Sequence, residues 1–365
     1  MPIYEESFRI GSGRYIQGKG YISKCGDEVK RVGTSAILIG DDTSLNLTRE
    51  KIADSMTAAG LKYEFIVHNG TCNDEAATKI ASYAKEKGYD VIVGVGGGVI
   101  MDFAKVCAHF ADMPVINIPT SSATCAAYTP LSVRYTPEGK TVGTMHFENE
   151  VNAVIADTEI MAAQPVRLLL SGVFDSLAKF LEIKHRYNEK DEIYPLGLDY
   201  AYVLSKRSYD FIVSKIQKCL DDIKKGEITE DFETLIFTLI AVTGVISGIA
   251  RGSNQTALGH KFYETTRFFF PEESKPYLHG EIVGVGLLLQ NHFNGEEENN
   301  TFLINLMKKY NMPFKITDVG VTDSTEVFEK YYEKISHSSA INHQNKEECE
   351  KFRQSLLYFR NLNKE

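Results

Sequence analysis

Three side chains that lie far apart in the sequence could together hold a metal ion: Asp175, His260 and His279. One carboxylate and two imidazoles are a common ligand set for a divalent cation, and zinc and iron both suit it. Each residue also has a structural interpretation. Asp175 could cap an apolar helix or pair with Lys179 four residues later, and a histidine in an apolar helix is often a hydrogen-bonded core residue. The sequence alone leaves both interpretations open.

A glycine cluster at residues 94–98 follows a predicted strand directly and leads into a predicted helix. Backbone amides of such a turn can approach the pyrophosphate of a dinucleotide closely, and the helix start adds unpaired N–H groups and about half a unit of positive charge. Val99 stands where the usual G-x-G-x-x-G pattern has its third glycine, so a tight structural turn is an equal alternative. Asp102 and Lys105, on the same helix, are also explained as an ion pair on a solvated face.

Polar side chains after two other predicted strands could complete a nucleotide site. Asp41 could accept hydrogen bonds from an adenosine ribose, or it could cap the next helix. A carboxylate there would repel a 2′-phosphate, which favours NAD over NADP. Thr120 and Ser121 follow the strand at 114–118, at the edge where open α/β sheets bind ligands, and their hydroxyls could reach phosphates or the nicotinamide ribose.

The apolar runs in the first 160 residues predict a Rossmann-like parallel sheet with helices between its strands. The predicted strands are 35–40, 63–68, 90–94, 114–118 and 152–156, and the predicted helices are 43–59, 74–87 and 98–110. The sequence at 136–139, Thr-Pro-Glu-Gly, is typical of a turn. A β-hairpin of residues 131–135 and 141–146 is therefore expected before the last strand.

Beyond about residue 160 the strand signal ends and helical periodicity dominates. The predicted helices are 165–187, 194–220, 230–251, 255–268, 280–294, 300–310 and 323–335. We therefore predict an α/β dinucleotide-binding domain of residues 1–160 and an all-helical metal-binding domain of residues 161–365.

Composition limits the classes of function. A hydrophobic content of 43% and a charged content of 24% are typical of a soluble globular protein. The net charge of -9 argues against nucleic acid and membranes as partners. Residues 1–7 carry acid where a signal peptide carries positive charge, and the apolar run 235–249 is short for a membrane helix. Six dispersed cysteines without a C-x-x-C pair indicate reduced thiols in a cytoplasm.

The order of these motifs resembles a known family. The chain resembles the iron-containing (group III) polyol and alcohol dehydrogenases, most closely the glycerol dehydrogenase-like branch, which has a dehydroquinate synthase-like fold. The matching segments are residues 94–105, 119–120, 131–135, 165–169, 172–178 and 279–281. The resemblance implies a metal-dependent, NAD(P)-linked dehydrogenase that acts on a small polyol such as glycerol and forms a homo-oligomer.

The resemblance also implies roles for individual residues. The metal ligands of the family, which are also its catalytic group, match Asp175, His260 and His279. Its nucleotide contacts match Asp41, Gly97, Gly98, Asp102, Thr120, Leu131, Val133 and Tyr135, with Thr129 standing at a family serine.

Two departures from the glycerol dehydrogenases bear on the substrate. Cys125 replaces the aspartate that approaches the polyol in those enzymes, and Tyr263 replaces a second histidine. Both residues are candidates for shaping the substrate pocket, with core packing as the alternative. The segment around Cys125 resembles a sub-branch of hydroxycarboxylate dehydrogenases. A neutral thiol tolerates a carboxylate better than an aspartate does, because like charges in a dry site repel each other.

Three alternatives to a polyol dehydrogenase therefore stay open. The first is an oxidoreductase of 2-hydroxy and 2-oxo acids. The second is a lyase of the dehydroquinate synthase type, which shares the fold, NAD and a metal. A lyase of this type, like a phosphopolyol dehydrogenase, requires basic residues near His260 or His279 for a phosphate, and the sequence indicates no such cluster. The third is a nucleotide-binding protein without catalysis, which an intact ligand set argues against.

Overall fold

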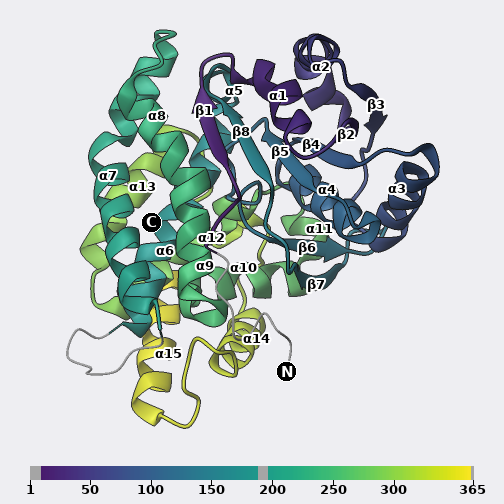
Figure 1. Ribbon diagram of the computed structural model, residues 1–365. Coiled ribbons are helices and arrows are strands. Elements are labelled where there is room, and N and C mark those ends of the chain that lie inside the picture. Colours follow the sequence, from purple (N-terminus) through teal and green to yellow (C-terminus); the bar gives the residue numbers. More distant parts are fainter. Residues whose placement is uncertain (1–9, 188–195, 363–365) are drawn as a thin grey trace. The chain divides into compact units, whose positions relative to one another are not determined.

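The computed structural model describes residues 10–187 and 196–362 (Figure 1). The predictions for residues 1–7 and for the first two residues of the 194–220 helix lie outside these residues. The chain divides into two compact units, Met1–Gln164 with Lys215–Gly248, and Pro165–Ser214 with Ile249–Glu365. The predicted second domain, residues 161–365, includes residues 215–248, which the structure groups with the first unit. The division into two functional domains stays a prediction.

The first unit contains a parallel sheet, as the sequence predicts, with six strands where five were predicted. Its strand order is β1 (Tyr15–Gly18), β8 (Ala153–Asp157), β5 (Val115–Pro119), β4 (Val91–Gly96), β2 (Ser35–Gly40) and β3 (Lys62–Val67). Strands β2, β4, β5 and β8 are buried along their whole length, which explains their continuous apolar runs. The edge strand β1 was not predicted, because its four residues give too short a signal.

Helices cover both faces of this sheet (Figure 1). Helices α1 (Cys25–Lys30) and α2 (Asp42–Ala58) share one apolar cluster with Val91, Val93 and Val95 of β4. The alternate residue Gly94 faces α4 (Gly98–Ala111), where a Cβ on this glycine would lie 2.7 Å from the Cβ of Ala104. Helix α3 (Asp74–Lys87) packs beside α4.

The connections leave the central pair β2 and β4 in opposite directions. Strand β2 is followed by β3 on one side, whereas β4 is followed by β5 on the other. In open α/β sheets, the carboxyl ends of strands at such a point form the crevice that binds a ligand. Asp41 follows the end of β2 and Gly97 follows the end of β4, so two of the predicted nucleotide residues flank this crevice.

The predicted hairpin is present as β6 (Leu131–Tyr135) and β7 (Thr141–His146), which pair antiparallel. Arg134 Nη1 donates a hydrogen bond to Asp74 Oδ2 at 2.6 Å, which ties the hairpin to α3.

Helices α8 (Glu230–Phe237) and α9 (Thr243–Ala250) are joined by the π-helical turn η3 (Thr238–Val242) into one segment of 21 residues. By length and composition this segment could cross a membrane, so the prediction that the apolar run 235–249 is too short for a membrane helix was wrong. Its threonines do not interrupt it, because Thr238 and Thr243 donate to the helix's own carbonyls. Of its most apolar 18-residue window 61% is buried in the protein, which is typical of a core helix.

The second unit is helical, as predicted. Its longer helices are α6 (Val166–Arg186), α10 (Leu258–Phe269), α12 (His279–Asn294), α13 (Asn300–Lys309), α14 (Thr325–Ser336) and α15 (Lys346–Asn361), and α7 (Leu198–Lys224) begins in this unit. The short elements of the chain are η2 (Tyr21–Lys24), α5 (Thr158–Ala163), η4 (Gly252–Gln255), α11 (Pro271–Ser274), η5 (Glu297–Asn299) and η6 (Thr317–Val319). Helix α15 was not predicted from the sequence.

Glycines allow α12 to lie close to its two neighbours. A Cβ on Gly280 would collide with the carbonyl oxygen of Ser171 on α6. A Cβ on Gly286 would lie 2.8 Å from the carbonyl oxygen of Gly259 on α10. A side chain at either glycine would therefore push apart the helices that carry the candidate metal ligands.

Candidate functional site

The structure brings together the three residues predicted to hold a metal. Asp175 lies in the middle of α6, His260 in the first turn of α10, and His279 at the first position of α12. The Nε2 atoms of both histidines lie 3.6 Å from Asp175 Oδ1. All three ligand atoms lie within 4.8 Å of one another.

The environment of Asp175 fits a divalent cation. Its side chain is 6% exposed, and Oδ1 accepts no hydrogen bond from any residue that the structure describes. A buried carboxylate oxygen in this state is costly unless an ion binds it. Donor atoms about 2.0–2.2 Å from a tetrahedral ion lie roughly 3.4 Å from one another. This is close to the 3.6 Å that separates each histidine Nε2 atom from Asp175 Oδ1. The proposal that Asp175 caps a helix is wrong, because α6 begins at Val166.

The alternative pairing of Asp175 with Lys179 is present as well. Lys179 Nζ lies 4.0 Å from Asp175 Oδ1, and both side chains are buried. From the sequence, the ion pair and the metal site are alternatives. In the structure the two occur at the same carboxylate, so one does not exclude the other.

Glu182 belongs to this site and was missed in the sequence. It is fully buried, and its Oε1 accepts hydrogen bonds from the backbone N–H groups of Ala257 at 2.7 Å and His260 at 2.9 Å. Its Oε2 contacts His260 Nδ1. Such a carboxylate fixes the ring and leaves Nε2 for the metal. Glu182 follows Asp175 by two helical turns, so two carboxylates on one face of an apolar helix were the available signal.

Charge and burial set different protonation states for the three candidate ligands. Burial opposes the charge on His260, but Glu182 outweighs it and raises the pKa of His260 to about 9. Burial lowers the pKa of His279. Burial also opposes ionisation of Asp175, but Lys179 and the two imidazoles outweigh it and hold its pKa well below the usual range. A cation must therefore displace a proton from His260.

An ion pair fixes the start of α12, where His279 lies. Arg167 donates to both oxygens of Glu281, each at 2.6 Å, and also to the carbonyl oxygen of Pro276 at 2.8 Å. Glu281 in turn accepts the backbone N–H of Leu278 at 2.7 Å. The matching segments at 165–169 and 279–281 therefore meet each other and position a candidate ligand.

Tyr263, predicted to shape the substrate pocket, borders the candidate metal site. Its ring centroid lies 4.4 Å from that of His279, with the rings at 73°. The side chain is half-buried. This position fits both the predicted role and plain packing, and the role stays a prediction.

The turn between β4 and α4 has the form of a phosphate cradle. Gly97 has φ -81° and ψ -175°, which any residue adopts, and a Cβ there would meet only Ser121 Oγ, at 3.6 Å. Neither backbone conformation nor packing requires a glycine at 97, which leaves close approach of a ligand as the physical reason. A Cβ on Gly96 would lie 2.8 Å from Ile100, and one on Gly98 would lie 3.0 Å from Thr124. No side chain caps the start of α4, so its first N–H groups suit an anion.

Asp41 and Thr120 lie beside this cradle. Asp41 caps α2, with Oδ1 accepting from Ser44 N at 2.9 Å and Oδ2 accepting from Ser44 Oγ at 2.8 Å. Ser44 Oγ also lies 3.1 Å from Thr120 Oγ1. The capping interpretation of Asp41 is therefore confirmed. A carboxylate has about four acceptor positions, so a ribose contact is compatible with the cap.

Asp102 and Lys105 are not on a solvated face, because both are buried. Lys105 Nζ donates to the carbonyl oxygens of Ala126 at 2.7 Å and Thr129 at 2.9 Å, and to that of Leu131. Asp102 pairs with Lys105, and its Oδ2 accepts the N–H of Val133 at 3.0 Å. The pair thus anchors the loop and strand that carry Thr129, Leu131, Val133 and Tyr135, four of the predicted nucleotide residues.

Cys125 is half-buried at the start of this anchored loop. None of the six cysteines forms a disulfide, as the sequence predicts. The structure places Cys125 in the first unit and Tyr263 in the second.

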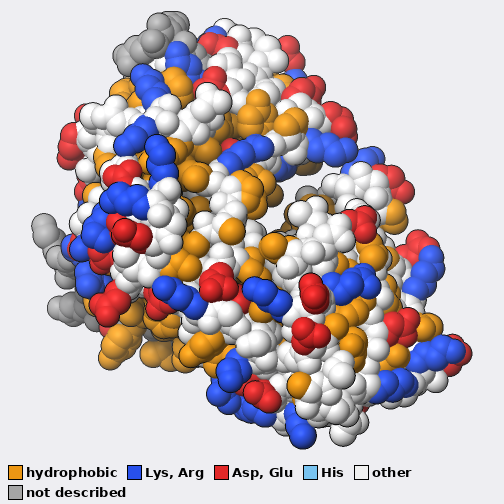
Figure 2. Space-filling model, turned by 90° about the horizontal axis from the view of Figure 1, so that it is seen from above, with side chains coloured by type: hydrophobic (Ala, Val, Ile, Leu, Met, Phe, Trp, Pro, Cys, Tyr) orange, Lys and Arg blue, Asp and Glu red, His pale blue; other side chains and the backbone are white. Residues whose placement is uncertain are grey.

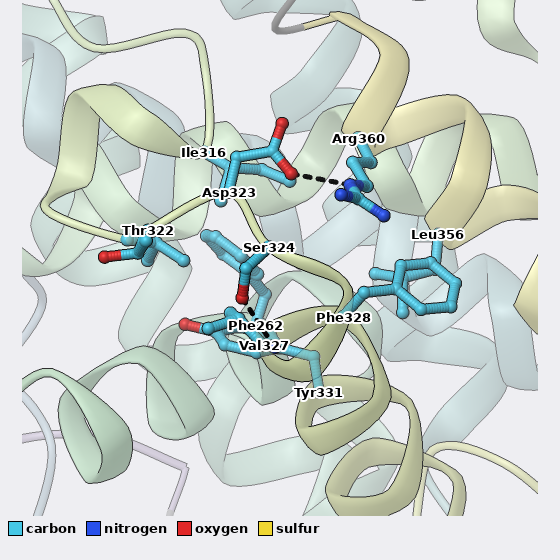
Figure 3. A pocket seen from close by; sticks show the side chains of 11 residues that line it. Phe262, Ile316, Thr322, Asp323, Ser324, Val327, Phe328, Tyr331, Leu356 and Arg360 are labelled. Carbon is cyan, nitrogen blue, oxygen red and sulfur yellow. Dashed lines mark hydrogen bonds and ion pairs between the residues drawn. The ribbon is translucent and has the colours of Figure 1, made fainter.

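Figure 3 shows a cavity in the second unit, which Phe262 of α10 helps to line. It has a volume of about 20 Å³, is lined by Phe262, Phe328, Tyr331 and Leu356, and is bordered by the Asp323–Arg360 ion pair. It holds no more than about one water molecule. Phe262 follows His260 by two residues, which places it about 200° around the helix axis. The cavity is therefore not the candidate metal site.

Comparisons with known proteins agree with these features. The family model described as iron-containing alcohol dehydrogenase matches residues 12–158. A glycerol dehydrogenase from Thermotoga maritima is 30% identical over 76% of this chain and 75% of its own. A glycerol-1-phosphate dehydrogenase [NAD(P)+] from Pyrobaculum islandicum is 31% identical over 80% of each chain.

The fold also matches a solved structure. The crystal structure of a probable glycerol dehydrogenase from Sinorhizobium meliloti 1021 superposes with a TM-score of 0.81, covering 98% of this chain and 99% of that one at 22% identity. The predicted architecture, a parallel α/β region followed by helices, is therefore confirmed. The chain belongs to the iron-containing alcohol dehydrogenase family.

Proposed function

We propose that this protein is a metal-dependent, NAD-linked dehydrogenase that transfers hydride between the nicotinamide and a small, glycerol-like polyol. The proposal depends on the way in which Asp175, His260 and His279 bring their ligand atoms together. The buried Oδ1 atom of Asp175 accepts no hydrogen bond from the described residues. The related glycerol dehydrogenase adds support for a polyol substrate. Family membership favours oxidation of an alcohol over the dehydroquinate synthase type of reaction and over a protein without catalysis.

Asp175, His260 and His279 would hold the ion, and either zinc or iron suits this donor set. A divalent ion there would supply Lewis-acid chemistry, which lowers the pKa of a bound water to about 7 and makes an alcohol easier to ionise. Glu182 keeps a proton on His260 Nδ1, so that Nε2 stays available. The Arg167–Glu281 pair holds the helix start at His279 in place.

The nucleotide would bind at the carboxyl edge of the sheet in the first unit. Gly97, Gly98 and the start of α4 would bind the pyrophosphate through backbone N–H groups. Asp41 would accept from the adenosine ribose and repel a 2′-phosphate, which favours NAD over NADP. We further assign nucleotide contacts to Thr120, Ser121, Thr129, Leu131, Val133 and Tyr135, with Asp102 acting through its bond to Val133.

A second candidate function is oxidation of 2-hydroxy acids and reduction of 2-oxo acids. The observation that favours it is Cys125, a neutral residue where the glycerol dehydrogenases carry an aspartate. We assign Cys125 and Tyr263 to the substrate pocket in either case.

We also propose that the protein works in the cytoplasm as a homo-oligomer, with neither nucleic acid nor a membrane as partner. The net charge is -9. On the face drawn in Figure 2, lysine and arginine side chains lie among aspartates and glutamates, which suits a soluble enzyme better than a nucleic-acid-binding surface.

The test is a coupled measurement of NADH and metal. We expect protein loaded with Zn²⁺ or Fe²⁺ to oxidise NADH with dihydroxyacetone and to reduce NAD with glycerol, and protein treated with a chelator to do neither. NADH consumption that does not depend on metal would contradict the proposal. Conversion of a substrate with no net change in NADH would favour a lyase.

A further inference from the structure

Lys179 is a charged side chain beside the candidate metal ligands that has no role in the proposed binding of the metal or the nucleotide. It lies one turn after Asp175 on α6, and its side chain is 6% exposed. Its Nζ lies 4.0 Å from Asp175 Oδ1, the same oxygen that faces both imidazoles. It donates one hydrogen bond, at 3.1 Å, to Gln255 Oε1. Lys179 therefore brings a positive charge to the edge of the position that a cation would occupy.

The charges around this ammonium group do not balance once a cation binds. An ammonium has three donors, and a buried one is stable only with an anionic partner. Asp175 is the nearest carboxylate, and a divalent ion would take up its charge. The other buried carboxylate, Glu182, is bonded to His260 and to two backbone N–H groups. A substrate with its own negative charge would restore the balance beside Lys179.

We propose that Lys179 binds a carboxylate of the substrate, so that the site takes small 2-oxo acids in preference to uncharged ketones. The proposal rests on the second candidate function above, the reduction of 2-oxo acids, and assigns the residue that binds the carboxylate of that substrate. In the reaction, hydride leaves C4 of NADH and bonds to the carbonyl carbon, while a proton from solvent bonds to the carbonyl oxygen. NADH is oxidised to NAD, and the 2-oxo acid is reduced to a 2-hydroxy acid.

The geometry favours a carboxylate over a phosphate. In a 2-oxo acid the carboxylate is bonded directly to the reacting carbonyl carbon, which suits an ammonium beside the ligand oxygen. A phosphate on a polyol lies further from the reacting carbon and is usually bound by several cationic groups. Arg267, whose guanidinium carbon lies 5.5 Å from the Tyr263 ring centroid, is already bonded to the carbonyl oxygens of Ser274 and Tyr277.

The main experiment compares kcat/KM of the metal-loaded wild type and of Lys179→Met with pyruvate, dihydroxyacetone and dihydroxyacetone phosphate. Methionine fills a similar volume without charge. We expect the wild type to prefer pyruvate, and the variant to lose roughly 10- to 100-fold with pyruvate, mostly through KM. The loss with dihydroxyacetone should be at least tenfold smaller. Lys184→Met is the matched control, because Lys184 lies on the same helix and pairs with Glu296.

A second readout does not depend on activity. Titration of the metal-free protein with Zn²⁺ should show tighter binding in Lys179→Met than in the wild type, by roughly tenfold, because the variant removes a like charge from the site. A side chain that merely supports the fold would have the opposite effect, since its loss would weaken metal binding. Lys179→Arg keeps the charge, and it should retain the preference for pyruvate.

Several outcomes would overturn the role of Lys179. These are an equal loss with pyruvate and dihydroxyacetone, weaker Zn²⁺ binding in Lys179→Met, or a loss confined to dihydroxyacetone phosphate. If Lys179→Met does not fold, a Lys179→Arg variant without the pyruvate preference overturns it too. A wild type that oxidises NADH with none of the three compounds would instead contradict the dehydrogenase function, and the Zn²⁺ titration would still test the charge of Lys179.

Discussion

The two candidate sites of this protein are built from different parts of the polypeptide. The nucleotide cradle in the first unit consists mainly of backbone, namely Gly97 and the N–H groups that begin α4. The candidate metal site in the second unit consists of side chains from three helices, Asp175, His260 and His279. A backbone site depends on the absence of side chains, whereas a side-chain site depends on particular atoms held in place by their neighbours. The two sites should therefore respond to mutation and pH in different ways.

The largest effect is expected at the side-chain site. Asp175→Asn removes the negative charge that a cation requires and keeps the size of the side chain. We expect metal content to fall to background and activity to fall by at least about 10³-fold, with cooperative unfolding and NADH binding retained. Metal analysis and steady-state kinetics check this, with His279→Ala as a second variant. Full turnover by either variant would contradict the ligand assignment.

At the backbone site, adding one methyl group should weaken nucleotide binding and leave the fold unchanged. A Cβ at Gly97 meets only Ser121 Oγ, at 3.6 Å, so Gly97→Ala should unfold at the same urea concentration as the wild type. We expect its Kd for NADH to rise roughly 10- to 100-fold, because the Cβ would occupy the approach of the pyrophosphate.

Gly96→Ala is the matched control, because its Cβ would lie 2.8 Å from that of Ile100. It should destabilise the protein by about 1–3 kcal/mol through overpacking. Unchanged NADH affinity in Gly97→Ala would show that no ligand approaches that glycine.

Glu182 offers a test of how far the metal site depends on neighbours of its ligands. Glu182→Gln keeps a similar shape but weakens the hold on His260 Nδ1, so metal affinity should fall about 10- to 100-fold. Nucleotide affinity should not change. Zn²⁺ titration and NADH fluorescence measure the two, and a metal affinity equal to that of the wild type would mean that Glu182 does not orient the ring.

The last difference between the two sites is in their pH dependence. The pKa of His260 is raised to about 9, so this imidazole carries a proton at neutral pH that a cation must displace. Metal affinity should therefore rise up to about tenfold per pH unit between pH 7 and 9 and level off above that range. Over the same range, NADH affinity should stay nearly constant. A metal affinity that is flat from pH 7 to 9 would contradict the protonation state assigned to His260.

The same contrast explains which parts of the structure could be predicted from the sequence. Strands β2, β4, β5 and β8 are buried apolar runs, and Gly97 lies directly after one of them, so the cradle is visible locally. Helix α15 was missed, because only a narrow apolar face at Phe352, Leu356 and Phe359 is buried among many charges.

Other features depend on tertiary structure and have no local signal. Lys105 was expected on a solvated face, yet backbone carbonyls from a distant loop make its burial possible. Glu182 and Lys179 become part of the metal site only when α10 packs against α6. The spacing of Asp175, His260 and His279 in the sequence does not by itself show that they share a site. The resemblance to a family, whose metal ligands match these three residues, made that expectation specific.

One measurement tests the metal site most directly: X-ray absorption spectroscopy at the edge of the bound metal, combined with metal analysis of the purified protein. The account predicts one Zn²⁺ or Fe²⁺ per chain, bound by nitrogen and oxygen donors at about 2.0–2.2 Å, with the scattering pattern of two imidazoles. Absence of bound metal, sulfur in the coordination sphere, or retention of the same spectrum in Asp175→Asn would contradict it.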